Sequence, residues 1–548
     1  MNRRERRTAK HSKTARNKLA AVTPAELYEA GLQHFRAGRL LDAQICCKEA
    51  LALKPEHADT LHLIGLLSLH AKQYDHAVEW IAAALQQSPK PEYLLSLGNA
   101  LQLLGRLDEA LKAYDRGVAL KPDDAGLWNS MGFVLTKLNR TDEAIRVFQH
   151  VVKLSPRHKE AAQICATLLV EANRFDEAVV YYTLFAEIEP GRAEVYQSRG
   201  LCHQRRARYE QAIADYERAL QLEPDNAHAQ WNLSLISMLM GKFEAGWVGR
   251  EARWKANGWV ERSFTQPRWR GQKAIAGRTI LLHADEGIGD AIQFSRYVPM
   301  VAALGARVIL EVQPPVHPLL AGLPGLAHSL PRDHPLPEFD LHCPLASLPL
   351  AFQTRIETIP LPVSCLPSIP EILRDQWERW LGPHDRLRVG LVWSGNQGHA
   401  NDHNRSTTLR VLLPMLDLDV TFVSLQKDPR EQDRITLCEC ANVRDANEHL
   451  TDFLATAALV SCLDLVITVD TSVAHLAGTL GCPVWIMLPF APDYRWLLDR
   501  DDSPWYPTAR LFRQDETRDY ARVVDRLRRE LMAMIRAKHC EPSWVAQN

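Results

Sequence analysis

The chain has 548 residues, of which 46% are hydrophobic and 24% are charged, and its formal net charge is −1. A chain of this length exceeds what one hydrophobic core supports, so we expect about two to four domains. The near-neutral charge excludes a global attraction to nucleic acid or to an anionic membrane. The sequence contains neither an apolar run of about 18 residues nor a signal-peptide core, which predicts a cytoplasmic protein without stable membrane insertion.

Residues 1–23 are rich in lysine and arginine and predict a disordered basic tail, with a weak anchor for polyanions or membrane surfaces as the alternative. The eleven cysteines are scattered, and neither a C-x-x-C pair nor a zinc-ligand spacing occurs among them. This pattern is typical of reduced, buried thiols. We therefore expect no metal site and no cofactor.

The first half of the chain repeats with a period of 33 or 34 residues. Three sets of positions follow this spacing: the prolines 55, 89, 122, 156, 190 and 224, the alanines 43, 77, 110, 144, 178 and 212, and the glycines 31, 65, 98, 132 and 200. The small residues allow two antiparallel helices to approach closely, and each proline ends a second helix because proline cannot continue it. In at least four of the repeats, an aspartate near the start of the second helix favours its N-terminus.

This pattern resembles tetratricopeptide repeats, six of them over residues 24–226, followed by an incomplete seventh pair that ends near residue 254. Stacked repeats form one continuous core and a concave groove, because no single repeat can bury its apolar face alone. Two interpretations stay open: a groove that binds an extended polypeptide, and a scaffold or oligomerisation module.

After Trp269 the pattern changes to short apolar runs that alternate with helical segments. This alternation predicts parallel sheets covered by helices. A proline-rich stretch near residues 359–372 separates two such series. We therefore expect two Rossmann-like domains, at residues 255–375 and 376–535, followed by a tail at 536–548. Ligands of such sheets bind beyond the carboxyl ends of the strands, so the residues that follow each strand are candidates for a site.

Three strand ends carry polar residues and glycines. The first is "HADEGIGDAIQF", in which Gly287 and Gly289 allow a tight turn and a close ligand approach, and Asp290 opens a helix. Asp290 is interpreted either as a helix cap or as a functional carboxylate.

The second strand end is a polar loop after Trp393 that offers Ser394, Asn396, His399 and Arg405 to a phosphate. Its alternative interpretation is a solvated surface loop. On the same rim, "VSLQKDPRE" supplies Gln426 and Lys427 as candidates for contacts with a nucleoside or its phosphates.

The third strand end is Asp470, followed by Thr471 and Ser472 at the start of a helix. The free amide groups and the dipole at such a start favour an anion, and His475 in the first turn can reach the same anion. Its alternative interpretation is an ordinary capped junction with His475 in the core.

Together, the three strand ends resemble the glycosyltransferases of the GT-B fold, in particular the ADP-heptose:lipopolysaccharide heptosyltransferases of glycosyltransferase family nine. The resemblance covers residues 275–515 and implies that Asp290 is the general base and that residues 470–475 hold the donor diphosphate. Ser472 stands where the family has glycine, and the family's basic residue before the Gly-Asp turn is missing. Repeats joined to a GT-B domain resemble the architecture of the protein O-GlcNAc transferases.

The resemblance implies an inverting, metal-independent transfer of a sugar from a nucleotide diphosphate donor to a protein or glycan acceptor. The repeats are expected to recruit the acceptor or a partner. A rival interpretation is a non-enzymatic adaptor that carries a degenerate GT-B domain.

Overall fold

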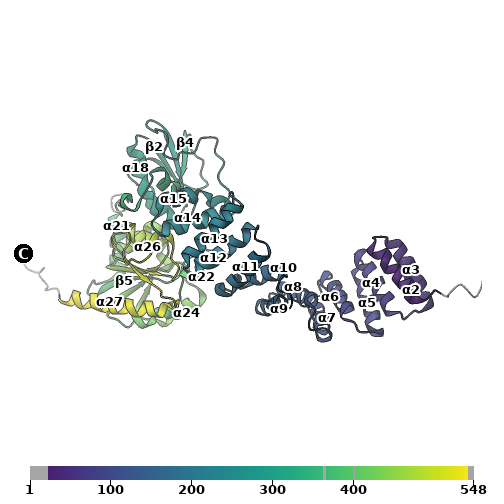
Figure 1. Ribbon diagram of the computed structural model, residues 1–548. Helices are drawn as coiled ribbons and strands as arrows, with labels where there is room; N and C mark the ends of the chain where they lie inside the picture. The colour runs from purple at the N-terminus through teal and green to yellow at the C-terminus, as the bar shows by residue number, and fades with distance from the viewer. Residues whose placement is uncertain (1–21, 362–365, 400, 541–548) are drawn as a thin grey trace, which may run out of the picture. The chain divides into compact units, whose positions relative to one another are not determined.

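The computed structural model describes residues 22–361, 366–399 and 401–540 (Figure 1). These residues form two compact units, the first up to Cys202 and the second from His203. The predicted basic tail lies outside the described residues except for residues 22 and 23, and the end of the predicted C-terminal tail, 541–548, also lies outside them.

The first unit consists of antiparallel helix pairs, as the repeats predict. Its helices are α2 (Pro24–Arg36), α3 (Leu40–Leu53), α4 (Ala58–His70), α5 (Tyr74–Gln87), α6 (Pro91–Leu103), α7 (Leu107–Leu120), α8 (Ala125–Lys137), α9 (Thr141–Leu154), α10 (Lys159–Glu171), α11 (Phe175–Ile188) and α12 (Ala193–Arg205), the last of which continues into the second unit. The second helix of each pair ends two residues before a repeated proline, which confirms the predicted helix ends.

The repeated glycines allow the close contact within a pair. A Cβ atom on Gly65 would lie 2.4 Å from Ile81, and one on Gly98 would lie 2.3 Å from the Tyr114 ring. Real Cβ atoms do not approach other atoms so closely, so these positions require glycine for packing rather than for a special backbone angle.

The start of each second helix differs from the prediction in its chemistry. The N-cap residue is arginine in several repeats, and it makes no side-chain cap hydrogen bond. Instead the arginine donates two hydrogen bonds of 2.7 Å to a glutamate three residues later, as Arg106 does to Glu109. The repeated aspartates lie in the first turn of the helix, where they favour its positive end.

The second unit begins with helices and continues with a four-stranded parallel sheet. Its first helices are α13 (Tyr209–Leu222), α14 (Ala227–Leu239), α15 (Phe243–Gly249), the 3₁₀ helix η1 (Arg250–Ala252) and α16 (Arg253–Ala256). The strands are β1 (Thr279–His283), β2 (Arg307–Val312), β3 (Leu326–Pro331) and β4 (Leu341–Pro344), in the spatial order β3-β2-β1-β4. The helices between and after them are α17 (Ile288–Phe294), η2 (Ser295–Tyr297), α18 (Val298–Ala303), α19 (His317–Leu320), η3 (Leu345–Ser347), α20 (Leu348–Ala351) and η4 (Ile356–Thr358).

A six-stranded parallel sheet follows, in the spatial order β10-β9-β8-β5-β6-β7. Its strands are β5 (Leu387–Val392), β6 (Val420–Ser424), β7 (Val443–Asp445), β8 (Leu465–Val469), β9 (Val484–Leu488) and β10 (Ala509–Arg513). The helices are α21 (Glu371–Leu381), α22 (Asp402–Arg405), α23 (Leu409–Leu412), η5 (Leu413–Met415), α24 (Glu431–Glu439), η6 (Asn447–His449), α25 (Phe453–Val460), α26 (Ser472–Thr479), η7 (Tyr494–Trp496) and α27 (Tyr520–Cys540).

Helix α27 closes the core of the six-stranded sheet. Its buried side chains Val523, Val524, Leu527 and Leu531 belong to the same cluster as Leu409 and residues of β5, β6 and β8. The helix continues past the domain end predicted at residue 535 and reaches Cys540. Among the described residues, no helix combines the length and the apolar character that a bilayer crossing requires.

Candidate active site

The order of both sheets singles out one position in each. The chain starts at a central strand, moves outward to one side, and then returns to the other side of that strand. In doubly wound sheets, ligands bind where the order reverses, outside the carboxyl ends of the strands. These switch points lie between β1 and β4 in the first sheet and between β5 and β8 in the second. The predicted site residues at 287–290, at 394–405 and at 470–475 follow β1, β5 and β8.

Asp290 lies in the first turn of α17, directly after the turn that follows β1. Its Oδ2 accepts a hydrogen bond of 3.0 Å from the backbone N–H of Gly287, the N-cap residue of the helix. Its Oδ1 accepts a hydrogen bond from the guanidinium of Arg495. Asp290 is therefore not the N-cap residue: it lies three residues after Gly287 and bonds back to it, and its other carboxylate oxygen is held by a residue 205 positions away in the chain.

The environment of Asp290 perturbs its protonation. Burial raises the pKa of Asp290 to about 7, and the neighbouring carboxylate of Glu286 adds to this rise, whereas Arg495 and Arg250 oppose it. The side chain keeps 21% of its surface exposed, so solvent or a substrate can still reach it. A carboxyl group that titrates near neutral pH and remains accessible has the properties of a general base.

Helix α17 packs directly against α26, which brings two of the predicted strand ends together. A Cβ atom on Gly289 would lie 2.7 Å from His475 and 3.5 Å from the Cα atom of Ser472. Neither Gly287 nor Gly289 has a positive φ. Neither position therefore needs glycine for its backbone angle, which corrects the predicted tight turn, and Gly289 instead makes room for the neighbouring helix.

His475 is buried and neutral. Its Nδ1 lies 2.8 Å from the Tyr506 hydroxyl, and its ring stacks on Trp496. Burial places the pKa of His475 well below its usual value, and the nearby arginines Arg495, Arg296 and Arg405 lower it further. A histidine in this state can donate or accept one hydrogen bond, but it does not supply a positive charge to an anion.

The start of α26 has no side-chain cap. Thr471 is the N-cap residue, and its hydroxyl contacts the Thr468 hydroxyl at 3.2 Å rather than the helix amides. Burial raises the pKa of the preceding Asp470 to about 6, and Asp493 adds to this rise, while Arg495 and Arg405 lower it. Thr471 and Ser472 thus present a helix N-terminus beside Asp470, in the arrangement that the sequence predicts.

The loop after β5 folds back so that the Arg405 side chain packs against the backbone of Gly395. A Cβ atom on Gly395 would lie 2.8 Å from the Arg405 guanidinium, and the buried Nε of Arg405 has no hydrogen-bond partner within the described part of the chain. The guanidinium also lowers the pKa of Asp470, so it lies near the start of α26. The buried Ser394 donates its backbone N–H to Gln426 Oε1 at 3.0 Å.

Gln426 and Lys427 differ in how free their side chains are. The Oε1 atom of Gln426 accepts hydrogen bonds from the backbone of Trp393 and Ser394, which ties the ends of β5 and β6 together. Lys427 is exposed, and its Nζ contacts the Asn447 carbonyl at 3.4 Å. The structure therefore gives Gln426 a structural role at the switch point and leaves the Lys427 ammonium in solvent.

Arg495 is a residue of this site that the sequence reasoning did not find. It lies in η7 and donates to Asp290, to Gln293 and, at 2.8 Å, to Asp493 Oδ1. Despite its burial, the surrounding acidic groups raise the pKa of Arg495, so it stays charged. It follows the end of β9, but without a glycine turn or a polar helix start, and only its burial next to two aspartates marks it.

Two arginines from the preceding helices pair with the acids of the turn before Asp290. Arg250 Nη2 lies 2.5 Å from Glu286 Oε2, and Arg253 Nη2 lies 2.6 Å from Asp285 Oδ2. Both arginine side chains are almost completely buried. The two acids of the turn are thus neutralised by the helical hairpin that follows the last full repeat.

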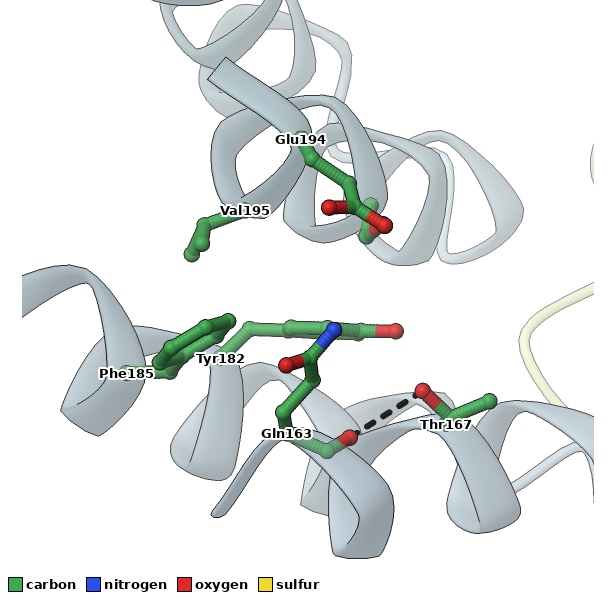
Figure 2. A pocket seen from close by; sticks show the side chains of 7 residues that line it. Gln163, Thr167, Tyr182, Phe185, Glu194 and Val195 are labelled. Carbon is green, nitrogen blue, oxygen red and sulfur yellow. Dashed lines mark hydrogen bonds between the residues drawn. The ribbon is translucent and has the colours of Figure 1, made fainter. Parts of the chain in front are cut away.

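Within the described residues, no group of three or more histidine, cysteine or acidic side chains is arranged to hold a metal ion. A small pocket in the first unit lies between α10, α11 and α12 (Figure 2). The residues that line it are Gln163, Thr167, Tyr182, Phe185, Glu194, Val195 and Ser198. Its volume of about 30 Å³ suits a few water molecules at most, so it is too small for a nucleotide sugar.

The similarity to known proteins is clear for the repeats. Models of the tetratricopeptide repeat match residues 28–91, 98–139, 125–158 and 193–226. A crystal structure of YrrB, described as a TPR protein with an unusual peptide-binding site, is 21% identical and covers 33% of this chain and 95% of its own, with a TM-score of 0.31.

Three curated relatives extend this comparison. Protein FlbA of Caulobacter vibrioides is 24% identical over 52% of this chain and 51% of its own length. A BBSome complex member BBS4 homolog of Drosophila melanogaster is 30% identical over 20% of this chain and 22% of its own. Protein O-mannosyl-transferase TMTC1 of Mus musculus is 31% identical over 17% of this chain and 11% of its own length.

The chain therefore spans about half the length of FlbA and less of the other two relatives. The FlbA match covers more of the chain than its first 254 residues, so it extends beyond the repeats. The helix pairs and the matched models agree that the first part of the chain consists of tetratricopeptide repeats.

Proposed function

We propose that the second unit is a glycosyltransferase of the GT-B type. It transfers a sugar from a nucleoside diphosphate donor to a hydroxyl group of a protein or glycan acceptor. The observation that carries this proposal is the contact between α17 and α26, which brings the carboxylate of Asp290 and the N-terminus of α26 together from two separate sheets.

In the proposed reaction, Asp290 takes the proton of the acceptor hydroxyl. At the same time, the oxygen of that hydroxyl attacks the anomeric carbon of the sugar. The bond from that carbon to the diphosphate breaks on the opposite face, so the configuration inverts. A positioned base contributes about 10²–10⁴-fold to such a step. Arg495 orients the carboxylate through its hydrogen bond to Oδ1.

The leaving diphosphate carries the negative charge that develops. Arg405 and the uncapped start of α26 at Thr471 and Ser472 supply positive charge and N–H donors for it. Because these groups can balance the charge, the proposal includes no metal ion. Ser394 and Lys427 flank the same rim and remain candidates for contacts with the nucleoside part.

The repeats are proposed to recruit the acceptor, which is a polypeptide or a glycan attached to one. Stacked repeats offer an extended surface to a chain-like partner. The TMTC1 match links repeats with a protein O-mannosyl-transferase in one relative, but its 102 residues equal the length of three repeats, which limits its weight.

The test is a screen of the full-length chain with a panel of nucleotide sugars, read as release of the nucleoside diphosphate with cell protein as acceptor. Asp290→Asn should keep the fold and lose transfer by about 10²-fold or more. Turnover by the Asp290→Asn variant at the rate of the unmodified chain would contradict the base role. Mass spectrometry of the acceptor proteins identifies the sugar added.

The adaptor is the second candidate, and one observation favours it: Asp290 already has an ion pair with Arg495 and a hydrogen bond to Gly287. A degenerate domain without transferase activity would bind no nucleotide sugar donor. A ligand that binds only the folded state raises the melting temperature. If no nucleoside diphosphate in a panel shifts the melting temperature of the full chain, the adaptor is favoured.

A further inference from the structure

Glu286 lies next to the proposed base and has no role in the reaction described so far. It stands four residues before Asp290, and its side chain is only 6% exposed. Its Oε2 is held by Arg250, and its Oε1 lies 3.3 Å from Arg253 Nε, an approach that does not form a hydrogen bond. A buried carboxylate with one unsatisfied oxygen beside a second carboxyl group is costly unless a proton is shared.

The same cation faces both acids. Arg250 Nη2 lies 2.5 Å from Glu286 Oε2 and 3.8 Å from Asp290 Oδ1. The guanidinium also donates to the carbonyl of Ala346 at 3.1 Å and lies over the rings of Trp231, Phe294 and Tyr494. These contacts come from four different elements, so Arg250 is fixed in place.

We propose that Glu286 and Arg250 form a proton-sharing unit with Asp290: Arg250 keeps Glu286 ionised, and Glu286 accepts a hydrogen bond from the protonated Asp290 carboxyl. The proposal rests on the proposed function, because it concerns the residue assigned there as the base. Glu286 and Arg250 act through Asp290, so they are positioning residues.

The shifts of the two acids agree with this geometry. Burial raises the pKa of Asp290, and the adjacent carboxylate of Glu286 raises it further. The pKa of Glu286 is lowered instead: burial opposes this, but Arg250, Arg253 and Arg495 favour its ionised form. These directions favour a proton on Asp290 and a negative charge on Glu286.

The proton balance of a turnover follows from this pair. Asp290 first releases its proton to solvent through its exposed edge, which leaves both acids ionised and held by the arginines. The carboxylate then accepts the proton of the acceptor hydroxyl, and this restores the resting pair. Arg250 thereby connects the helical hairpin at the end of the repeats to the protonation of the base.

Charged and titratable groups from several elements face the pair and enter its titration. They are Arg250 of η1, Arg253 of α16, Asp285 of the turn, Arg495 and Tyr494 of η7, His475 of α26 and Tyr506 of the loop before β10. His475 stays neutral and the tyrosines stay protonated, because burial lowers the pKa of His475 and raises the pKa of both tyrosines. The arginines and acids therefore set the pair's behaviour.

The experiment follows the protonated-carboxyl signal of Asp290 by difference infrared spectroscopy of the full-length chain between pH 5 and pH 9, values chosen to span its pKa of about 7. The signal is assigned by its loss in Asp290→Asn. Glu286→Gln should lower the midpoint by roughly 1–3 pH units, because a negative neighbour is removed. Arg250→Met should raise the pH midpoint of the Asp290 signal, because a positive neighbour is removed. Arg250→Lys should bring that midpoint part of the way back to the value of the unmodified chain.

Glu311→Gln is the matched control, because Glu311 is equally buried in the first sheet but pairs with Arg262 and does not face Asp290. If Glu286→Gln moves the midpoint no more than Glu311→Gln does, the proton-sharing unit is rejected. A merely structural role would lower the stability of the variants without opposite shifts of the midpoint. If the Arg250 variants do not fold, the comparison of Glu286→Gln with Glu311→Gln still tests the proton-sharing unit.

The measurement needs no substrate, so it separates the two proposals. Opposite shifts without any detectable sugar transfer would support the unit and contradict the transferase. Transfer that depends on Asp290, with a midpoint that Glu286→Gln does not move, would support the transferase and overturn the unit.

Discussion

Gly289 and His475 touch so closely that a Cβ atom on residue 289 would lie 2.7 Å from Cδ2 of the histidine ring. His475 cannot move away easily, because it bonds to Tyr506 and stacks on Trp496. The contact between α17 and α26 therefore depends on the absence of a side chain at position 289. This packing requirement explains the glycine before Asp290.

Gly289→Ala should destabilise the second unit by about 1–3 kcal/mol, the usual cost of an added methyl group in a tightly packed site. Gly398→Ala is the matched control, since it lies in an exposed loop of the same unit where a Cβ meets only Asn396 at 3.4 Å. Urea unfolding followed by tryptophan fluorescence measures the difference. Equal midpoints for the two variants would show that α17 and α26 can separate at no cost.

Arg405 and Lys427 are both predicted donor contacts, but the structure treats them differently. Arg405 Nε is buried without a partner within the described part of the chain, whereas the Lys427 ammonium is exposed. Arg405→Gln should weaken binding of a nucleoside diphosphate by about 10- to 100-fold, because a charge-assisted hydrogen bond is lost. Lys427→Gln should change the affinity less than threefold or so. Isothermal titration calorimetry measures both, and the reverse ranking would contradict the assignment.

Several features of the fold follow from local sequence alone. The repeated prolines fix the ends of the second helices, and the strongly apolar strands at the sheet centres are recognisable as continuous hydrophobic runs. The strands β3 and β7 lie at edges of their sheets and expose several of their residues. Edge strands are covered on fewer sides, so they carry more polar residues and lose the pattern that identifies a strand.

The candidate site was predictable only in part for a similar reason. Asp290, Thr471 and Ser472 follow strands and so carry a positional signal. Arg250 follows no strand, and Arg495 follows β9 without a recognisable motif. The roles of both depend on contacts with Asp290 and Glu286 from distant parts of the chain. A single sequence shows the acids Asp285 and Glu286 of the turn, but it does not show which arginines pair with them.

Transfer should depend on pH through Asp290. Because the pKa of Asp290 is raised to about 7, the base is protonated below that pH, and the rate should fall about tenfold for each further pH unit. Above pH 7 the rate should level off. A rate that stays constant from pH 5 to pH 8, values on both sides of that pKa, would contradict the assignment of the base.

The same shift makes a prediction about stability. Between the ordinary pKa of 3.8 and the raised value of about 7, the folded state binds a proton that the unfolded state has lost. Asp290 therefore contributes stability that decreases as the pH rises through this window. Asp470 adds to the same trend, since its pKa is raised to about 6. Asp290→Asn should flatten the curve of unfolding free energy against pH, and an unchanged slope would argue against the raised pKa.

The helical hairpin at the end of the repeats should be required for the folding of the sheets. A chain shortened to begin at Pro190 keeps α12 and the whole hairpin that carries Arg250 and Arg253. A chain shortened to begin at residue 255, the domain start predicted from the sequence, loses both arginines and leaves Asp285 and Glu286 without their ion-pair partners. Removing one partner of a buried pair costs about 3–5 kcal/mol.

The longer shortened chain should therefore be soluble and unfold cooperatively, and the shorter one should not. Circular dichroism and thermal melts of both chains measure this. The double variant Asp285→Asn, Glu286→Gln in the shorter chain separates charge from packing, because it removes the unpaired acids and should recover part of the lost stability. If the chain that begins at residue 255 folds as well as the one that begins at Pro190, the arginines of the hairpin are not required to balance the turn, and the repeats are a separate module.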